Sequence, residues 1–221
     1  MDEVAVFPLP LVVFPGMSVP LHVFEERYKA LVKHTETLDP PRFAIAPPST
    51  HALEEEGVAK PGEVGTIVDV IETQENVDGT YTIVGHGIER CRLRYTRFEQ
   101  VPERDGSVRP LWFANVDDWP LERNDPNEEA IAAWDALEAF DRYGNVFFAP
   151  QAREQARDAL PDDPLYQASF VCANLRLPAE NAQRLLEAPS LVDRFTRARD
   201  AIDERIAAHE AGEMLHPSSD A

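Results

Sequence analysis

The 221-residue sequence is poor in cysteine, and it has no uninterrupted apolar run that could form a membrane-spanning helix. Its two cysteines, Cys91 and Cys172, are too few for a disulfide framework and indicate buried free thiols in a reducing compartment. The uncharged residues 4–21 contain four prolines, and each proline breaks a helix. The first residues, MDEVAVF, are acidic where a signal peptide is basic. We therefore expect a cytoplasmic protein with no membrane partner.

Positive charge is also scarce. Lysine and arginine together number 21, against 40 aspartates and glutamates, so the formal net charge is −19. A general nucleic-acid binder needs a basic surface to neutralise phosphates, and a protein held on anionic lipid needs basic clusters. The composition therefore disfavours both nucleic acid and an anionic membrane as partners.

The motifs of several large enzyme classes are missing. The sequence has no Gly-Lys-Ser/Thr phosphate loop, no G-x-G-x-x-G dinucleotide fingerprint, no G-x-S-x-G elbow and no H-E-x-x-H zinc motif. Its six histidines show no i, i+4 pairing, and neither cysteine belongs to a C-x-x-C pair. We therefore predict no catalytic residue, no cofactor and no metal site.

The pattern of apolar residues changes from strand-like to helical near residue 115. Asp78-Gly79 between two β-rich runs predicts a hairpin, and a helix fits residues 24–34. The β-rich runs are residues 4–9, 11–14, 19–24, 42–46, 65–72, 80–85, 88–95 and 108–116. Helices are predicted at residues 126–144, 164–176, 179–187 and 191–211, and the stretch 145–161 has no clear pattern. We thus expect an α+β protein with a β subdomain at 1–116, a helical subdomain at 117–211 and a disordered tail at 212–221.

The first helix after residue 116 has a clear start signal. Asp125 predicts the N-cap, Pro126 the first helical position and Glu128 a capping-box acid. Helical spacing then predicts one shared apolar face. Its members are Ile131, Trp134, Leu137 and Phe140.

Three polar clusters each allow a functional and a structural interpretation. His86 between two glycines fits a catalytic histidine or, as we favour, a β-bulge. The glutamates at 54–56 fit a cation site or, as we favour, an acidic loop. Alternate residues of the run 88–95 fit an anion-binding site or, as we favour, a solvated strand face paired with acids. These residues are Arg90, Arg92 and Arg94, predicted to face away from Cys91, Leu93 and Tyr95.

The run FPLPLVVFPGMSVPLHVFEERY resembles the opening of the substrate-binding domain of the ATP-dependent Lon proteases. That family begins with F-P-L, an apolar strand, P-G and L-P-L-x-I-F-E-x-R-Y. Matching residues here are Phe7, Pro8, Leu9, Phe14, Pro15, Gly16, Pro20, Leu21, Phe24, Glu25, Arg27 and Tyr28. The resemblance implies a six-stranded β pseudo-barrel of the PUA-like type with one helix, followed by a C-terminal helical bundle. It further implies a stand-alone, non-enzymatic form that lacks the ATPase and peptidase domains.

The resemblance also implies a protein that binds unfolded polypeptides or partner proteins. We predict contacts at Phe14, Met17 and Tyr28, although Phe14 and Tyr28 also fit the core. One alternative is an RNA-binding module of the PUA-like type that uses the three arginines. Another is a small-molecule enzyme with a cleft between the two subdomains that uses His86. The sequence leaves the oligomeric state open.

Overall fold

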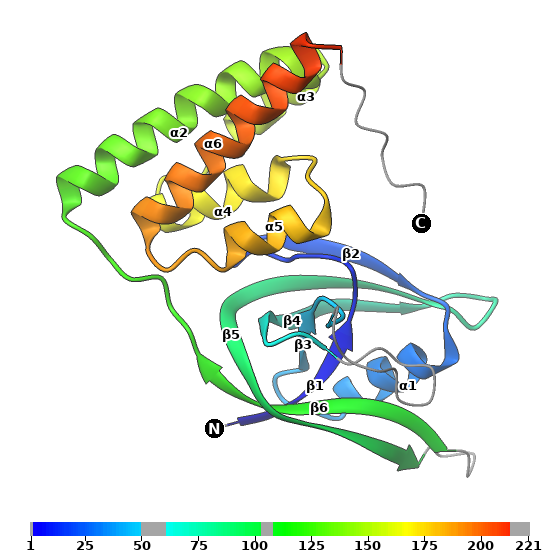
Figure 1. Cartoon of the computed structure of the whole chain (residues 1–221). Helices are drawn as coiled ribbons and strands as arrows, with labels where there is room; N and C mark the ends of the chain where they lie inside the picture. Colours follow the sequence, from blue (N-terminus) through cyan, green and yellow to red (C-terminus); the bar gives the residue numbers. More distant parts are fainter. Residues whose placement is uncertain (1, 50–60, 103–107, 213–221) are drawn as a thin grey trace. The chain divides into compact units, whose positions relative to one another are not determined.

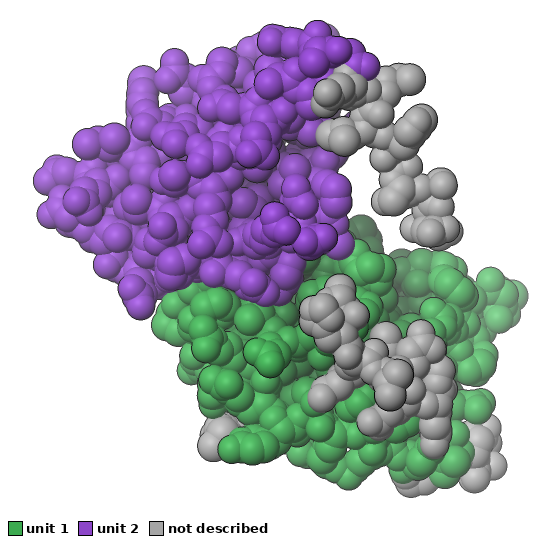
Figure 2. All heavy atoms as spheres, in the orientation of Figure 1, with its two compact units in different colours: residues 1–120 green, residues 121–221 purple. Residues whose placement is uncertain are grey.

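The computed structural model describes residues 2–49, 61–102 and 108–212 (Figure 1). The chain divides into two compact units, Met1–Pro120 and Leu121–Ala221, which Figure 2 shows in different colours. The glutamate run at 54–56, and the predicted tail beyond Gly212, lie outside the described residues. The predicted subdomain limits at 116 and 117 stay a prediction.

Unit 1 contains one six-stranded sheet, and five of its strands form a closed hydrogen-bonded ring (Figure 1). The ring runs β5–β4–β3–β1–β6 and returns to β5, while β2 pairs with β5 outside the ring. The strands are β1 (Asp2–Pro8), β2 (Ser18–Val23), β3 (Arg42–Ala46), β4 (Val64–Glu75), β5 (Tyr81–Pro102) and β6 (Val108–Asp118). The α+β class is confirmed. The sequence predicted a pseudo-barrel of six strands, whereas the closed ring contains five.

The ring closes because β5 is long enough to pair with several partners. Its first part pairs with β2 and β4, and its second part pairs with β6. The sequence predicted two separate strands, 80–85 and 88–95, with a bulge at residues 85–87. The structure instead has one continuous strand, and its register shift leaves Ile88 between the paired residues Gly87 and Glu89. The bulge therefore lies one residue beyond its predicted place.

The hairpin that joins β4 to β5 has the predicted turn. Gly79 adopts a φ of 76°, a left-handed conformation that suits glycine. Its N–H donates to the Asn76 carbonyl at 2.9 Å, and the Asn76 N–H donates to the Thr80 carbonyl at 2.8 Å. Asp78 accepts hydrogen bonds from the Thr80 hydroxyl and, with a smaller effect, from the Thr80 backbone N–H, and both lower the pKa of its carboxyl group.

Residues 11–14, predicted as a strand, form no strand but still contribute to the core. Val13 and Phe14 are buried, and the Val13 carbonyl accepts a hydrogen bond from Thr66 Oγ1 at 2.6 Å. The segment passes close to Gly87, where a Cβ atom would lie 2.7 Å from the Phe14 carbonyl oxygen. Prolines on both sides remove backbone donors, so the apolar run packs without joining the sheet.

Helix α1 (Glu26–Thr35) is fixed to the sheet by an apolar cluster. The cluster contains Leu31 and Val32 of the helix together with Phe43 of β3 and Ile83 of β5, and each is at most 3% exposed. Full burial of one such side chain contributes about 1.5–3 kcal/mol. The C-terminal half of α1 is therefore held firmly against the strands.

Unit 2 is helical over its described residues. One core cluster joins three of its helices through Ala136, Ala168, Leu191 and Phe195. The helices are α2 (Pro126–Phe147), α3 (Pro150–Asp158), α4 (Pro164–Asn174), α5 (Ala179–Leu186) and α6 (Leu191–Glu210). Among the described residues, no helix is both long and apolar enough to span a membrane. The predicted arrangement as a helical bundle stays a prediction.

Helix α2 starts at Pro126, as predicted, but the acid of its cap lies one residue beyond the predicted one. Asp125 is the N-cap, as predicted, but the acid that completes the cap is Glu129 and not Glu128. The Glu129 carboxylate accepts from the Asn124 N–H at 2.8 Å and from two nitrogens of Arg123 at 2.8 and 2.6 Å. The hydrogen bonds of the cap thus include the backbone of Asn124, the residue before the N-cap.

The buried face of α2 agrees with its prediction at Phe140, which is 9% exposed, and differs from it at two other positions. Ile131 and Trp134 are 64% and 71% exposed, while Ala133 and Ala136 are buried. Small residues at these positions let neighbouring helices approach closely, so the bulky Ile131 and Trp134 lie outside. The helix continues to Phe147, beyond the predicted end at residue 144, and α3 occupies much of the stretch that had no clear pattern.

Candidate functional site

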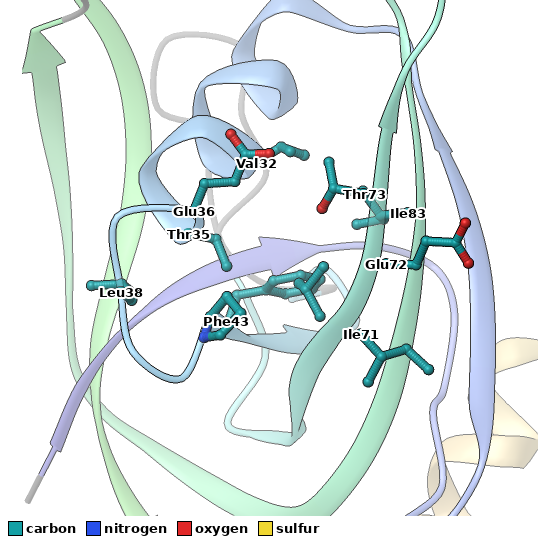
Figure 3. Close-up of a pocket in the computed structure, with 11 residues that line it drawn as sticks. Val32, Thr35, Glu36, Leu38, Phe43, Ile71, Glu72, Thr73 and Ile83 are labelled. Carbon is teal, nitrogen blue, oxygen red and sulfur yellow. The ribbon is translucent and has the colours of Figure 1, made fainter.

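Unit 1 has a pocket of about 260 Å³ beside the C-terminal end of α1 (Figure 3). Its walls come from the end of α1, the segment leading into β3, the middle of β4, and one residue each of β3 and β5. We call it the α1–β4 pocket. It is lined by Val32, Thr35, Glu36, Leu38, Pro41, Phe43, Val70, Ile71, Glu72, Thr73 and Ile83.

Buried residues form the floor of the α1–β4 pocket. Val32, Phe43 and Ile83 belong to the core cluster that fixes α1 to the sheet. Thr35 is 1% exposed, and its hydroxyl already donates to the Leu31 carbonyl at 2.8 Å. The floor is therefore apolar and held in place by the packing of unit 1.

An irregularity in β4 supplies an apolar rim. The register shift between Val70 and Glu72 leaves Ile71 without a partner in the ladder, and its side chain is 63% exposed. Leu38, which follows α1, is 37% exposed. Large apolar side chains exposed beside a cavity favour contact with another apolar group.

Two carboxylates give the rim negative charge. Glu36 of the segment after α1 and Glu72 of β4 lie on different sides of the pocket in Figure 3. Among the described lining residues there is no histidine, cysteine or lysine. The arrangement suits binding of an apolar side chain that has a cation beside it.

The residues predicted to contact polypeptide do not form one exposed surface. Phe14 is 1% exposed, and Tyr28 packs on Phe7 with 4.3 Å between ring centroids. Burial raises the pKa of the Tyr28 hydroxyl group. Met17 is half-buried, and its N–H donates to the Phe14 carbonyl at 3.1 Å. Phe14 and Tyr28 therefore contribute to the core, and Met17 keeps part of its surface.

The predicted anion-binding arginines do not share one solvated face. Arg90 is 3% exposed, and its guanidinium donates to the carbonyls of Trp119 and Pro120, the latter at 3.0 Å. Arg92 is exposed and lies over the Trp119 ring, 4.3 Å from its centroid. Arg94 Nε bonds to Asp117 Oδ2 at 3.1 Å. The favoured interpretation of a solvated face is corrected for Arg90, because its charge holds the backbone at the end of unit 1.

The predicted alternation along this strand also stops early. Cys91 and Leu93 are buried as expected, but Tyr95 is 80% exposed. Tyr95 has a φ of 48°, and it lies within the register shift between Arg94 and Arg97. This second irregularity turns the tyrosine outward, since a shift of one residue reverses the faces of a strand.

The surroundings of His86 and of the two cysteines fit structural roles. His86 Nδ1 lies 3.2 Å from Ser18 Oγ on the neighbouring strand β2. Cys91 and Cys172 are buried, and desolvation raises the pKa of each thiol to about 12. Within residues 2–49, 61–102 and 108–212, no group of three or more histidines, cysteines or carboxylates could hold a metal ion.

Sequence reasoning missed the α1–β4 pocket. Ile71 belongs to a run, GTIVDVIE, that reads as an ordinary strand, and only the register shift brings its side chain to the rim. Leu38 lies in a segment with little pattern. The one available signal was a pair of acids near apolar residues, with Glu36 two positions before Leu38 and Glu72 directly after Ile71, a pattern that is common in amphipathic segments.

Comparisons with known proteins agree on one family. The sequence profile of the ATP-dependent protease La (LON) substrate-binding domain matches residues 3–204. A Lon protease of Elusimicrobium minutum is 24% identical over 208 residues, which cover 93% of this chain and 24% of that protein. A Lon protease of Solibacter usitatus is 26% identical over 199 residues, which cover 89% of this chain and 23% of that protein. The chain thus spans about a quarter of the length of these curated relatives.

Two solved structures share the fold. The N-terminal domain of the Mycobacterium avium complex Lon protease superposes with a TM-score of 0.69 at 18% identity, covering 92% of this chain and 99% of that one. A Lon N-terminal domain protein from Xanthomonas campestris gives a TM-score of 0.54 at 19% identity, covering 94% and 98%.

Proposed function

The chain belongs to the family of the ATP-dependent protease La (LON) substrate-binding domain, and on that basis we propose that it binds polypeptide segments at the α1–β4 pocket. The observation that carries the proposal is the pocket itself, which has an apolar floor, an exposed apolar rim and two carboxylates. The preferred segment has one large apolar side chain beside a lysine or arginine.

The size of the pocket suits one such side chain. A cavity of about 150 Å³ accepts benzene, so a pocket of about 260 Å³ can hold an aromatic or branched aliphatic group with part of its backbone. Buried Phe43 and Ile83 would contact that group, and Ile71 and Leu38 would cover it from the rim.

Charge favours a basic neighbour in the bound segment. Glu36 and Glu72 lie at the rim of the pocket, and the whole chain carries a net charge of −19. A field of this sign steers cationic segments to the surface and repels acidic ones.

We further propose that this role is binding without chemistry, in the cytoplasm. The support is the family match, which covers a substrate-binding domain, and the two buried cysteines, which suit a reducing compartment. Met17 and Tyr28 remain proposed contacts of the bound chain. Tyr28 precedes Val32 by one helical turn on α1, so it extends the same helix face away from the pocket. Phe14 is buried and is no longer proposed as a contact.

The positions of the arginines favour a polypeptide over RNA as partner. An RNA site would need several exposed cations, but Arg90 is buried and Arg94 is paired with Asp117. Arg97, further along β5, is paired with Glu3. We therefore propose no RNA site on this strand.

A fluorescent peptide with a phenylalanine between two arginines tests the proposal. We expect a dissociation constant of about 10–100 μM, as for a small interface with one anchor residue. Ile71→Lys removes the apolar rim and adds a cation, so we expect at least about tenfold weaker binding, measured by fluorescence anisotropy. Val77→Lys is the matched control, because Val77 is a fully exposed β-branched residue that does not line the pocket.

The binding measurements test the pocket, polypeptide binding and the role of the two carboxylates separately. Equal affinities for Ile71→Lys and the native protein would reject the pocket as the site. No saturable binding at tens of micromolar, by a protein with native circular dichroism, would reject polypeptide binding itself. Equal affinity for a peptide with glutamates in place of the arginines would reject the role of Glu36 and Glu72.

A further inference from the structure

Unit 2 has a second cavity, of about 190 Å³, between α2 and α3. We propose that this α2–α3 cavity is a binding site for a small apolar carboxylate, a ligand class that is independent of the polypeptide site in unit 1. The cavity is lined by Leu137, Phe140, Asp141, Gly144, Phe148, Arg153, Ala156, Arg157 and Leu160.

The interior of the α2–α3 cavity is apolar and aromatic. Phe140 and Phe148 are in edge-to-face contact with 5.9 Å between their centroids, and Phe140 also contacts Phe170 at 6.1 Å. Leu137 and Leu160 add aliphatic walls. An aromatic or alkyl group is therefore the part of a ligand that this space can desolvate.

The cavity is left open because α3 fills little of the space beside α2. None of the nine residues of α3 is buried, so the helix contributes no large side chain to the core. The lining residue between its two arginines is a small one, Ala156, and α2 contributes Gly144 to the lining. A Cβ atom on Gly144 would lie 3.4 Å from Phe148 and 3.5 Å from Arg153, so the absence of that carbon enlarges the cavity.

The polar groups of the lining carry a net positive charge. Arg157 Nε bonds to Asp141 Oδ1 at 3.1 Å, whereas Arg153 donates to Asn145 Oδ1, a neutral acceptor. Two guanidinium groups therefore lie against one carboxylate. The hydrogen bond from Arg157 is the main cause of a lowered pKa of the Asp141 carboxyl group, and the charge of Arg153 contributes less.

This local charge is opposite in sign to that of the whole chain, which is −19. The neighbouring acids of α3, Glu154 and Asp158, are exposed and do not line the cavity. An anionic head group placed beside Arg153 would gain a charge-assisted hydrogen bond while its apolar part entered the cavity. A cationic or neutral ligand of the same shape would lack that bond.

The volume limits the size of the ligand. A cavity of about 150 Å³ accepts benzene, so about 190 Å³ accommodates a phenyl group with one or two methylenes. The probe of choice is 3-phenylpropionate, and 3-phenylpropanamide is its uncharged equivalent. A ligand of this size reaches a dissociation constant of about 1 mM, which ligand-observed NMR titration measures.

Substitutions on α3 test the site without disturbing the core. Ala156→Phe fills the cavity, so we expect at least about tenfold weaker binding of 3-phenylpropionate. Ala152→Phe places the same side chain at an exposed position of the same helix that does not line the cavity, and binding should stay unchanged. Arg153→Gln should remove most of the preference for the acid over the amide while leaving binding of the amide as it is.

The results decide each part of the proposal. It is overturned if 3-phenylpropionate shows no saturable binding, or if Ala156→Phe binds it as the native protein does. Equal affinity for acid and amide in the native protein would overturn the role of the arginines. Variants of the α1–β4 pocket such as Ile71→Lys should bind 3-phenylpropionate as the native protein does. If the α2–α3 cavity binds no carboxylate, the polypeptide proposal is unaffected. If the α1–β4 pocket binds no polypeptide, the carboxylate proposal is unaffected.

Discussion

Replacing Glu129 by glutamine should make the stability of unit 2 less dependent on pH. The Glu129 carboxylate is 6% exposed, and it accepts two hydrogen bonds from Arg123 and one from the Asn124 N–H. The hydrogen bonds from Arg123 are the main cause, and that from Asn124 the second, of a pKa lowered from 4.5 to about 2. Glutamine keeps the shape and one acceptor but loses the charge.

The lowered pKa of Glu129 sets the size and the sign of its contribution to the unfolding free energy. A change from 4.5 to about 2 corresponds to at most about 3.4 kcal/mol, at about 1.36 kcal/mol for each pH unit. Because the Arg123 side chain is 59% exposed and water screens it, we expect about 1–2 kcal/mol. The folded state holds the ionised form, so this stabilisation is complete above pH 4.5 and is lost as the pH falls toward about 2.

Urea denaturation followed by far-UV circular dichroism, repeated from neutral to acid pH, measures the effect. The native protein should exceed Glu129→Gln in unfolding free energy by about 1–2 kcal/mol at neutral pH, and the two should converge near pH 2. Glu128→Gln, an exposed acid in the same helical turn, is the control and should match the native protein. A gap between native and Glu129→Gln proteins that stays constant with pH would refute the reasoning, because it would show that the charge is not its source.

Two further predictions concern the core. Gly65→Ala should lower the unfolding free energy by about 2–3 kcal/mol in thermal or urea denaturation, because the new methyl group would overlap the Ile45 carbonyl oxygen and crowd Ala46. A change in unfolding free energy within about 0.5 kcal/mol would contradict this close approach. Cys91 and Cys172, with thiol pKa values of about 12, should resist iodoacetamide at mildly alkaline pH in the folded protein and react after unfolding, as mass spectrometry would show. Rapid labelling before unfolding would contradict their burial.

Local signals in the sequence predicted the parts of the fold that depend on nearby residues. The turn at Asp78-Gly79 and the N-cap at Asp125 both occur where expected, because a positive φ and an unsatisfied helix N-terminus each require particular residue types. The opening motif alone indicates the correct family, since prolines and aromatic residues at fixed spacing form a specific pattern.

Features that depend on distant residues were missed. The alternation of the run 88–95 could not show the register shift that turns Tyr95 outward, or the carbonyl groups at residues 119 and 120 that draw Arg90 inward. Helical spacing placed Trp134 on an inner face because bulky apolar residues usually lie inside, but close helix packing selected alanines instead. The α1–β4 pocket depends on an unpaired residue of β4, and no local pattern encodes that.

The closed ring of strands has a consequence for the polypeptide binding that we propose. A free strand edge offers a row of unpaired N–H and carbonyl groups, and a second extended chain can add to it and start an aggregate. Each ring strand has at least two partner strands, so among the described strands β2 alone has a single partner. Pro20 lies within β2 and has no N–H to donate, which weakens that edge as a template. A segment bound at the α1–β4 pocket would therefore leave again without having been recruited into a sheet at the β2 edge.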